Sequence, residues 1–233
     1  MTAFRNMVRI LGPAVGAYAL AVRPRLLRWG ATDEEVRRPF PGAELVPNGR
    51  RSATMAATID APPPLVWVWL LQMGSDRDGW YSWDGLGKRD GADGDGADGK
   101  HVHPDWHSIS VGDRLASVPS APAWFEVAAL ERHRFMGLTA DRNSDTGGSR
   151  PHFHSDTMWG FLLQELPGNR TRLVVSGYAD TRPRLLGALG NFLFWDLAHW
   201  TIQMRQFANL NRRAAALVEI PSPSPIDRDS VPA

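Results

Sequence analysis

Two pairs of histidines are the residues of this sequence whose type and spacing most resemble a metal site. The first is His101-x-His103, followed by His107, and the second is His152-x-His154. Side chains at positions i and i+2 of a strand point to the same side, so each pair offers two nitrogens to one ion. No acidic residue stands nearby at a spacing typical of a metal site, and the alternative is that these histidines are exposed or hydrogen-bonded. We therefore expect no metal.

The second histidine pair is also out of phase with the apolar residues that follow it. Trp159, Phe161 and Leu163 occupy alternate positions. If these three face a core, His152 and His154 lie on the opposite face of the strand unless a bulge intervenes. This phase is a second argument against a metal site inside the fold.

An acidic run at residues 90–99 consists almost only of Asp, Gly and Ala, and its Asp93-x-Asp95-Gly96 segment resembles the start of a calcium loop. An EF-hand needs a glutamate at the twelfth position of the loop and flanking helices. Pro104 stands at that position. We therefore expect a solvated, flexible loop rather than a calcium site.

Composition excludes several further classes of function. The chain has no cysteine, which removes disulfides, thiol nucleophiles and cysteine-ligated zinc. It contains neither a Gly-x-Ser-x-Gly motif nor a glycine-rich phosphate loop that opens a helix. Its 26 basic and 25 acidic residues nearly balance, and no basic stripe with interleaved aromatics is present, so we expect no nucleic-acid partner. We also expect no cofactor.

The N-terminus resembles a secretory signal, because Arg5 and Arg9 precede an apolar stretch over residues 10–22. Gly12-Pro13 interrupts the stretch, and three arginines follow it at residues 23, 25 and 28, where exported chains avoid positive charge. The stretch is also shorter than the ~20 residues of a membrane span. We expect a helix docked on its own domain, with peripheral membrane contact through residues 4–28 as the alternative.

Capping and alternation predict the elements that must position any site. Thr32 and Glu35 form a capping box, and the helix that it opens ends at Pro39. Residues 52–60 alternate as a strand, and the prolines at 62–64 suit the first turn of a helix that Gly74 ends. Five further strands are expected at residues 114–118, 123–130, 134–140, 153–166 and 171–178, as in an antiparallel meander.

The C-terminal part predicts one long amphipathic helix from about Arg182 to Glu219. Its apolar residues follow a spacing of three and four: Leu186, Leu189, Leu193, Leu197, Trp200, Met204, Phe207, Ala214 and Val218. We expect three regions: a helical extension and loop at 1–50, a sheet-and-helix domain at 51–219, and a disordered tail at 220–233. The fold class is α+β, with a curved antiparallel sheet wrapped around the C-terminal helix and an extra N-terminal helical segment.

This pattern resembles the helix-grip fold of the START-like SRPBCC superfamily, which includes lipid-transfer domains and aromatic polyketide cyclases. The closer resemblance, over residues 25–218, is to an actinobacterial-type subgroup. It rests on six motifs: Arg28-Trp29-Gly30-Ala31-Thr32, Ile59-Asp60-Ala61-Pro62-Pro63 leading to Val66-Trp67, Gln72-Met73-Gly74, Gly79-Trp80-Tyr81-Ser82-Trp83-Asp84, His103-Pro104-Asp105-Trp106 and Val111-Gly112-Asp113-Arg114. The acidic run at 90–99 departs from the subgroup, which has a more apolar loop there.

The resemblance implies a cavity between the sheet and the C-terminal helix, and the ten tryptophans suit either such a cavity or a filled core. The residues expected to contact a ligand are Trp69, Trp80, Tyr81, Trp124, Trp159, Trp200, Gln203 and Phe207. We expect a cytoplasmic carrier of a lipid, polyketide or aromatic metabolite rather than an enzyme. The alternative is a polyketide cyclase or dehydratase, in which His103, His199 or Asp84 would act as acid or base.

Overall fold

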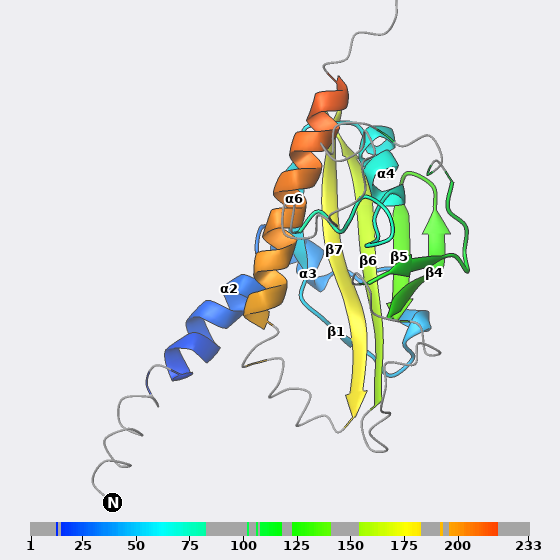
Figure 1. The fold of residues 1–233 in the computed structure, drawn as a ribbon. Coiled ribbons are helices and arrows are strands. Elements are labelled where there is room, and N and C mark those ends of the chain that lie inside the picture. The colour runs from blue at the N-terminus through cyan, green and yellow to red at the C-terminus, as the bar shows by residue number, and fades with distance from the viewer. Residues whose placement is uncertain are drawn as a thin grey trace, which may run out of the picture.

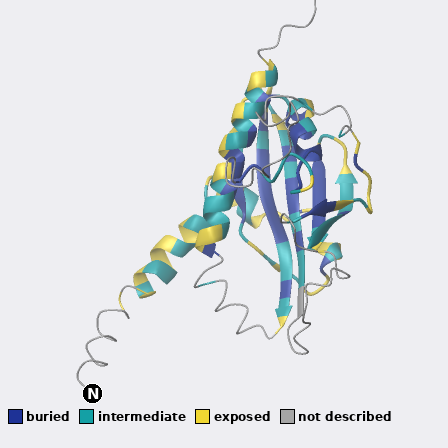
Figure 2. Ribbon diagram, in the orientation of Figure 1, coloured by how far each residue is buried: buried dark blue, intermediate teal, exposed yellow. Residues whose placement is uncertain are grey.

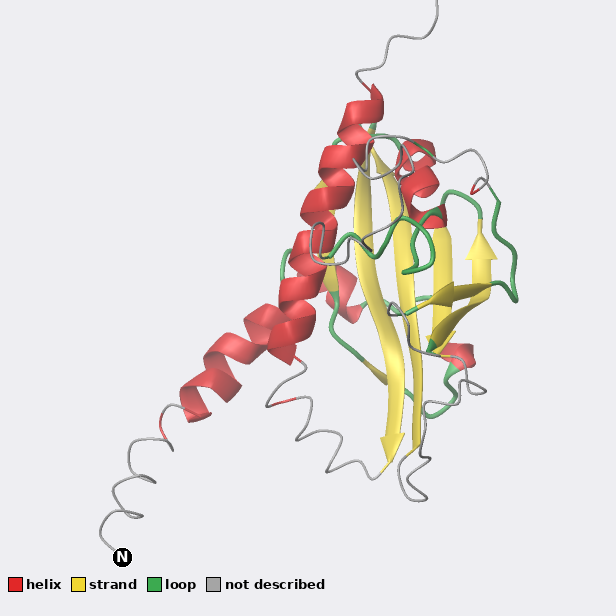
Figure 3. Ribbon diagram, viewed as in Figure 1, coloured by secondary structure: helices red, strands yellow, loops and turns green. Residues whose placement is uncertain are grey.

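The structure is a computed structural model that describes residues 13, 15–82, 102, 106, 108–117, 123–140, 154–182, 192 and 196–218. Its main helical segments are the π-helical turn η1 (Tyr18–Val22), α2 (Arg23–Leu27), α3 (Asp33–Arg37), the 3-10 turn η2 (Ala43–Leu45), α4 (Pro63–Leu71) and α6 (Asp196–Val218). Its strands are β1 (Arg50–Arg51), β2 (Met55–Ile59), β3 (Arg114–Ala116), β4 (Trp124–Glu131), β5 (Phe135–Ala140), β6 (His154–Leu166) and β7 (Arg170–Arg182). Figure 1 and Figure 3 show these helices beside a single twisted sheet.

The seven strands form one antiparallel sheet in the order β1-β7-β6-β5-β4-β3, and β2 pairs with β7 next to β1. The strands β3 to β7 follow one another as neighbours, which confirms the predicted meander. The helix α6 packs against α4, β2 and α2 (Figure 1). A curved antiparallel sheet that holds a long C-terminal helix is a helix-grip fold.

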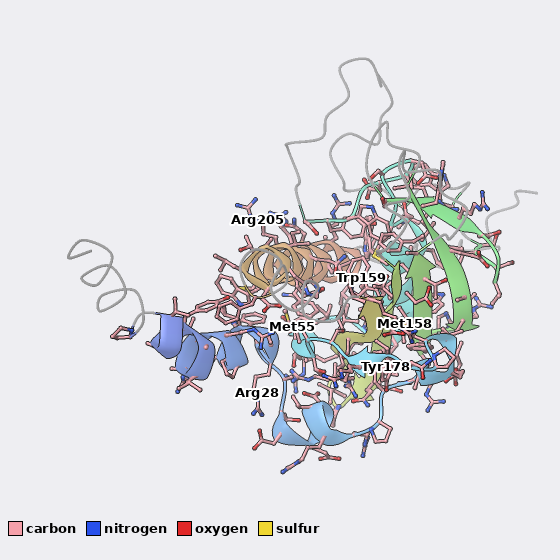
Figure 4. The ribbon with its side chains drawn as sticks, turned by 90° about the horizontal axis from the view of Figure 1, so that it is seen from below. Arg28, Met55, Met158, Trp159, Tyr178 and Arg205 are labelled. Carbon is pink, nitrogen blue, oxygen red and sulfur yellow. The ribbon has the colours of Figure 1, made fainter. Side chains whose placement is uncertain are left out.

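The two faces of the sheet carry separate apolar clusters. The inner cluster, toward α6 and α4, contains Trp159, Phe161 and Leu163 of β6, as the alternation predicts. The outer cluster contains Met158 and also Phe40 from the N-terminal segment. Figure 2 shows the burial along the middle of the sheet, and Figure 4 shows Trp159 on the α6 side with Met158 on the α3 side. Residues 31–46 are therefore an outer layer of the fold.

The N-terminal segment is fixed by features that can be read from its sequence. The Thr32 hydroxyl accepts a hydrogen bond from the Glu35 backbone, and the Glu35 carboxylate accepts one from Thr32, which confirms the capping box. The helix α3 ends before Pro39, since the residue that precedes a proline disfavours the helical region. At Gly30, with φ of +70°, a Cβ would overlap the carbonyl oxygen of Ala56, so only glycine allows this approach to β2.

The long C-terminal helix begins later than its sequence pattern predicts. Arg182 is the last residue of β7, where it pairs with His154, and α6 begins at Asp196. The prediction of a helix start at Arg182 is therefore wrong, because pairing with β6 continues for four residues beyond Tyr178. The predicted stripe residues Leu186, Leu189 and Leu193 lie outside the described residues.

The buried face of α6 also differs from the predicted stripe. Leu197 and Val218 are about half exposed, at 52% and 51%. Phe207 and Ala214 of the predicted stripe are buried, and the other side chains buried on α6 are Asp196, Gln203, Gln206 and Leu210. Two glutamines thus lie in the interior, where a purely hydrophobic periodicity does not place them.

The proposed division of the chain at residue 50 stays a prediction, as does the disordered tail, because residues 219–233 lie outside the described part. Phe40 and Val46 of the predicted extension nevertheless share the outer cluster with Met158 and Val174 of the sheet. Within the part of the chain that the structure describes, no helix combines the length and apolar character needed to cross a bilayer.

Candidate functional site

An aromatic cluster lines the inner face of β4 and β6. The ring of Trp159 lies 5.4 Å from Trp80, 6.0 Å from Phe125 and 4.7 Å from Phe161, measured between centroids. Trp80 meets Phe125 edge-on at 5.3 Å. Alternation along the strands places Phe125 and Trp159 on this face, while Trp80 comes from the loop that follows α4. These four rings therefore form one packed aromatic cluster.

A row of polar side chains on α6 holds the loop that carries Trp80. Gln203 donates from Nε2 to Gln206 Oε1 at 2.7 Å, and Gln206 donates to the carbonyl oxygen of Trp80 at 3.0 Å. Asn209 donates to the carbonyl oxygen of Tyr81 at 2.6 Å. These residues recur at a spacing of three on the helix, so they share one face. We call residues 74–82 the gripped loop.

The same face of α6 ends in a mostly buried ion pair. The Arg213 guanidinium pairs with the Asp78 carboxylate, and their side chains are 9% and 17% exposed. The guanidinium also lies 4.5 Å from the Tyr81 ring centroid and 5.3 Å from that of Trp69. Tyr81 has a positive φ of 58°, and its hydroxyl donates to the Trp69 carbonyl at 2.9 Å. The interactions from Trp69, Asn209 and Arg213 therefore fix an uncommon backbone conformation at Tyr81.

Four buried side-chain polar atoms, from α4, β6 and α6, have no hydrogen-bond partner among the described residues. They are the indole nitrogens of Trp69, Trp159 and Trp200 and the Oε1 atom of Gln203. Most buried polar groups in proteins are paired, and an unpaired one costs about 1–3 kcal/mol. All four atoms belong to residues that the sequence analysis names as ligand contacts. Three of them are donors and one is an acceptor.

His199 lies beside Trp200 near the start of α6. Burial lowers the pKa of His199 below its ordinary value, and the nearby Asp196 carboxylate opposes this shift in part. Asp196 itself pairs with Arg23 of α2 at 2.6 Å. The surroundings of His199 therefore favour the neutral imidazole over the charged form.

The other predicted ligand contacts occupy different places. Trp69, Tyr81 and Phe207 are at most 2% exposed and belong to the packed core. Trp124 lies on the face opposite its neighbour Phe125, which is the residue that packs with Trp80. Alternation would have found Phe125, since Phe125 and Val127 are apolar where Glu126 between them is charged. Whether any of these residues touches a ligand stays a prediction.

Several candidate chemical residues lie outside the described residues: Asp84, His101, His103, His107, His152 and the acidic run at 90–99. Among the described side chains, no three histidines, cysteines or carboxylates gather at a distance suited to a metal ion. The residues that sequence reasoning missed are Phe125, Gln206, Asn209 and Arg213. The signal for the last three is polar residues at helical spacing within an otherwise apolar face.

Two hollows lie away from the aromatic cluster. One, of about 520 Å³, is open and lies beside α2, lined by Leu20, Ala21, Pro24, Arg25, Arg28, Trp29 and Gly30. The other, of about 150 Å³, lies between α3 and the outer face of the sheet. Trp29, which lines the N-terminal hollow, also stacks on Phe207 of the core, with 6.2 Å between ring centroids.

Comparison with known proteins finds similarity in fold only. The sequence matches no family model, and no curated protein matches it. An aromatase/cyclase from a Streptomyces species is 16% identical with a TM-score of 0.41, over 74% of this chain and 98% of that chain. A protein from Arthrobacter aurescens is 14% identical with a TM-score of 0.42, over 81% of this chain and 99% of that chain. One from Mesorhizobium loti is 18% identical with a TM-score of 0.40, over 68% of this chain and 97% of that chain. Similarity at this level assigns neither a family nor a ligand.

Proposed function

We propose that the protein binds a hydrophobic small molecule, such as a lipid, polyketide or aromatic metabolite, between the inner face of the sheet and α6. The observation that carries this proposal is the set of unpaired buried polar atoms among aromatic rings. The indole N–H groups of Trp159 and Trp200 are donors, and Gln203 Oε1 is an acceptor. A molecule with a carbonyl and a hydroxyl group on an apolar frame would satisfy such atoms while burying its apolar surface.

Apolar burial would supply most of the affinity, at about 25 cal/mol per Å² before the costs of ordering. The polar atoms would supply orientation and selectivity, because a ligand that lacks their partners leaves them unpaired. The gripped loop would support the site, since Gln206 holds Trp80 against Trp159. We therefore expect an aromatic compound with carbonyl and hydroxyl groups to bind better than a hydrocarbon of the same shape.

The first experiment is native mass spectrometry of the full chain, with organic extraction of any co-purified molecule. Binding is then measured by quenching of tryptophan fluorescence with emodin, a hydroxylated anthraquinone, and with anthracene as the hydrocarbon control. We expect Trp159→Phe and Trp200→Phe, which each remove one donor, to weaken emodin binding about fivefold to tenfold. Trp67→Phe is the matched control, because Trp67 packs edge-on against His133 at 6.1 Å rather than in the aromatic cluster, and we expect it to leave emodin binding unchanged.

Equal affinity of all three variants would overturn the role of the unpaired donors. Failure of emodin to bind, together with an extract empty of any apolar molecule, would overturn the binding proposal itself. The measured unfolding of each ligand-free variant checks that the fold is retained.

The second candidate function is acid–base catalysis of the cyclase or dehydratase type, favoured by the partly buried His199, whose pKa is lowered by burial. In that case a bound polyketone would lose or gain a proton at the imidazole. We expect His199→Gln to lower turnover of an extracted ligand about 100-fold or more in such an enzyme. A carrier would instead show unchanged binding and no turnover in either protein.

A further inference from the structure

Exposed apolar side chains gather at the N-terminal end of the described structure. Leu20 is 84% exposed, and Val15 and Val22 are 51% and 45% exposed. Leu197, at the start of α6, is 52% exposed. These are four of the six large apolar side chains that are exposed in the described part of the chain. We call these four residues the N-terminal apolar patch.

The segment that carries most of this patch is strongly basic. Residues 1–28 contain five arginines and no acidic residue, although the whole chain has 26 basic and 25 acidic residues, so the remainder is net acidic. Arg25 donates to the Ala21 carbonyl and has no acidic partner among the described residues. The closest acidic residues in sequence, Asp33 and Glu34, are engaged in ion pairs with Arg28 and Arg38.

The described part of this segment, residues 15–28, is attached to the body of the protein. Thr54 donates its backbone N–H to the Leu27 carbonyl at 2.8 Å, and Ala56 donates to the Trp29 carbonyl at 3.0 Å. The Arg23–Asp196 ion pair at 2.6 Å ties α2 to the start of α6. Figure 1 shows α2 leading away from the body beside this end of α6, and Figure 2 shows its exposed surface.

The hollow of about 520 Å³ beside α2 is lined by both apolar and basic side chains. Leu20 and Pro24 supply apolar lining, and Arg25 supplies a guanidinium group, while the Arg28 guanidinium at the same hollow is paired with Asp33. Guanidinium groups pair well with phosphate oxygens, and apolar side chains beside them enter the acyl boundary of a bilayer. Trp29 at the same hollow offers an indole, which is favoured at the depth of lipid headgroups.

We propose that the N-terminal apolar patch and its arginines dock the protein on an anionic membrane surface. The charge of the segment argues for anionic lipid rather than for a second copy of this chain, because two copies would bring the same arginines together. Leu20, Val15 and Val22 would enter the interface, while Arg25 would contact lipid phosphate. This proposal is independent of whether the interior binds a ligand.

The test is co-sedimentation of the full chain with vesicles of phosphatidylcholine alone and of phosphatidylcholine mixed with phosphatidylglycerol. We expect binding to the mixed vesicles that weakens as salt is raised, and little binding to pure phosphatidylcholine. Leu20→Asp should weaken binding about tenfold or more, because its apolar burial is lost. Val111→Asp is the matched control, since Val111 is 61% exposed and lies in the turn before β3, outside the N-terminal apolar patch.

Charge is tested in the same way with Arg25→Glu, which should weaken binding about fivefold or more. Arg170→Glu, at the exposed start of β7, is its control. Absence of binding to the mixed vesicles, or equal effects of Leu20→Asp and Val111→Asp, would overturn the proposal. So would a dimer in size-exclusion chromatography that Leu20→Asp dissociates, because a second copy would then occupy the patch. Unchanged thermal unfolding of each variant confirms that the patch was altered without loss of the fold.

Discussion

Because His199 is mostly buried, its protonation makes the free energy of unfolding depend on pH. Its pKa lies below the ordinary value of 6.5, because burial disfavours the charged imidazole more than the Asp196 carboxylate favours it. The unfolded chain binds a proton at this residue at a higher pH than the folded chain does. The free energy of unfolding therefore falls as the pH is lowered from above 6.5 toward the folded pKa, and is retained above 6.5.

We expect His199→Gln to flatten this part of the pH profile, because the variant has no group to protonate on unfolding at that position. Urea unfolding at pH values on both sides of 6.5 measures the effect. His133→Gln is the control: burial and Arg132 lower the pKa of His133 too, but His133 lies nearer the surface and should contribute less. An unchanged slope in His199→Gln would show that the imidazole is not protonated on unfolding in this range.

At the scale of elements, α6 holds the gripped loop in position. Its contacts with that loop run from Gln206, which Gln203 supports, through Asn209 to the Arg213–Asp78 pair. A buried ion pair is a weak source of net stability, but removal of one partner leaves an unpaired buried charge. The pair thus makes the position of the loop depend on the helix.

We expect Arg213→Met to lower the free energy of unfolding by about 3 kcal/mol, because Asp78 is left without its guanidinium. Chemical denaturation monitored by circular dichroism measures this change. Arg37→Met, at an exposed position of α3, should change stability by less than about 0.5 kcal/mol. Adding Asp78→Asn to Arg213→Met should recover part of the loss; a double variant no more stable than Arg213→Met would mean that the ring contacts of Arg213 dominate.

Alternation and capping predict most of these elements, because each depends on neighbours within a few residues. The strand at Met55–Ile59 and the box at Thr32 and Glu35 are examples. The start of α6 could not be predicted in this way, since the alternation ends at Tyr178 while the β6–β7 hairpin continues to its open end, where Arg182 pairs with His154. The tryptophans of the candidate site could be predicted from the sequence, but the polar residues of α6 that hold the gripped loop could not. Gln206 and Arg213 acquire their roles only when the gripped loop is placed beside α6.

At the scale of the whole molecule, the sheet is covered on both faces. The outer layer, residues 31–46, is fixed to the sheet by the Arg172–Glu35 pair, with distances of 2.7 and 2.8 Å between nitrogens and carboxylate oxygens. Burial alone would raise the pKa of Glu35. The hydrogen bonds from Arg172 and Thr32 together outweigh burial, so the pKa of Glu35 lies below its ordinary value. Phe40 then packs edge-on against Phe135 of the sheet at 5.9 Å.

We expect Phe40→Ala to lower the free energy of unfolding by about 3 kcal/mol, since it opens a cavity between the outer layer and the sheet. Urea unfolding followed by both tryptophan fluorescence and circular dichroism measures the loss. Val111→Ala, at an exposed position, should change stability by less than about 0.5 kcal/mol.

Gly160 provides a second test of this contact. A Cβ at Gly160 would lie 2.7 Å from Phe40 Cε1, so Gly160→Ala should destabilise the protein. The loss should be smaller in a Phe40→Leu background, because the shorter side chain relieves the overlap. Strict additivity of the two substitutions would contradict the packing of Phe40 on Gly160.

The hydrogen bonds between α6 and the gripped loop have a consequence for how such proteins diverge. Gln206 and Asn209 donate to the main-chain carbonyl oxygens of Trp80 and Tyr81, not to their side chains. A carbonyl oxygen is present whatever residue occupies the position. During evolution residue 80 can therefore change, and with it the shape of the aromatic surface, while the helix retains its hold on the backbone. A single scaffold of this kind can acquire new ligand preferences without first being refolded.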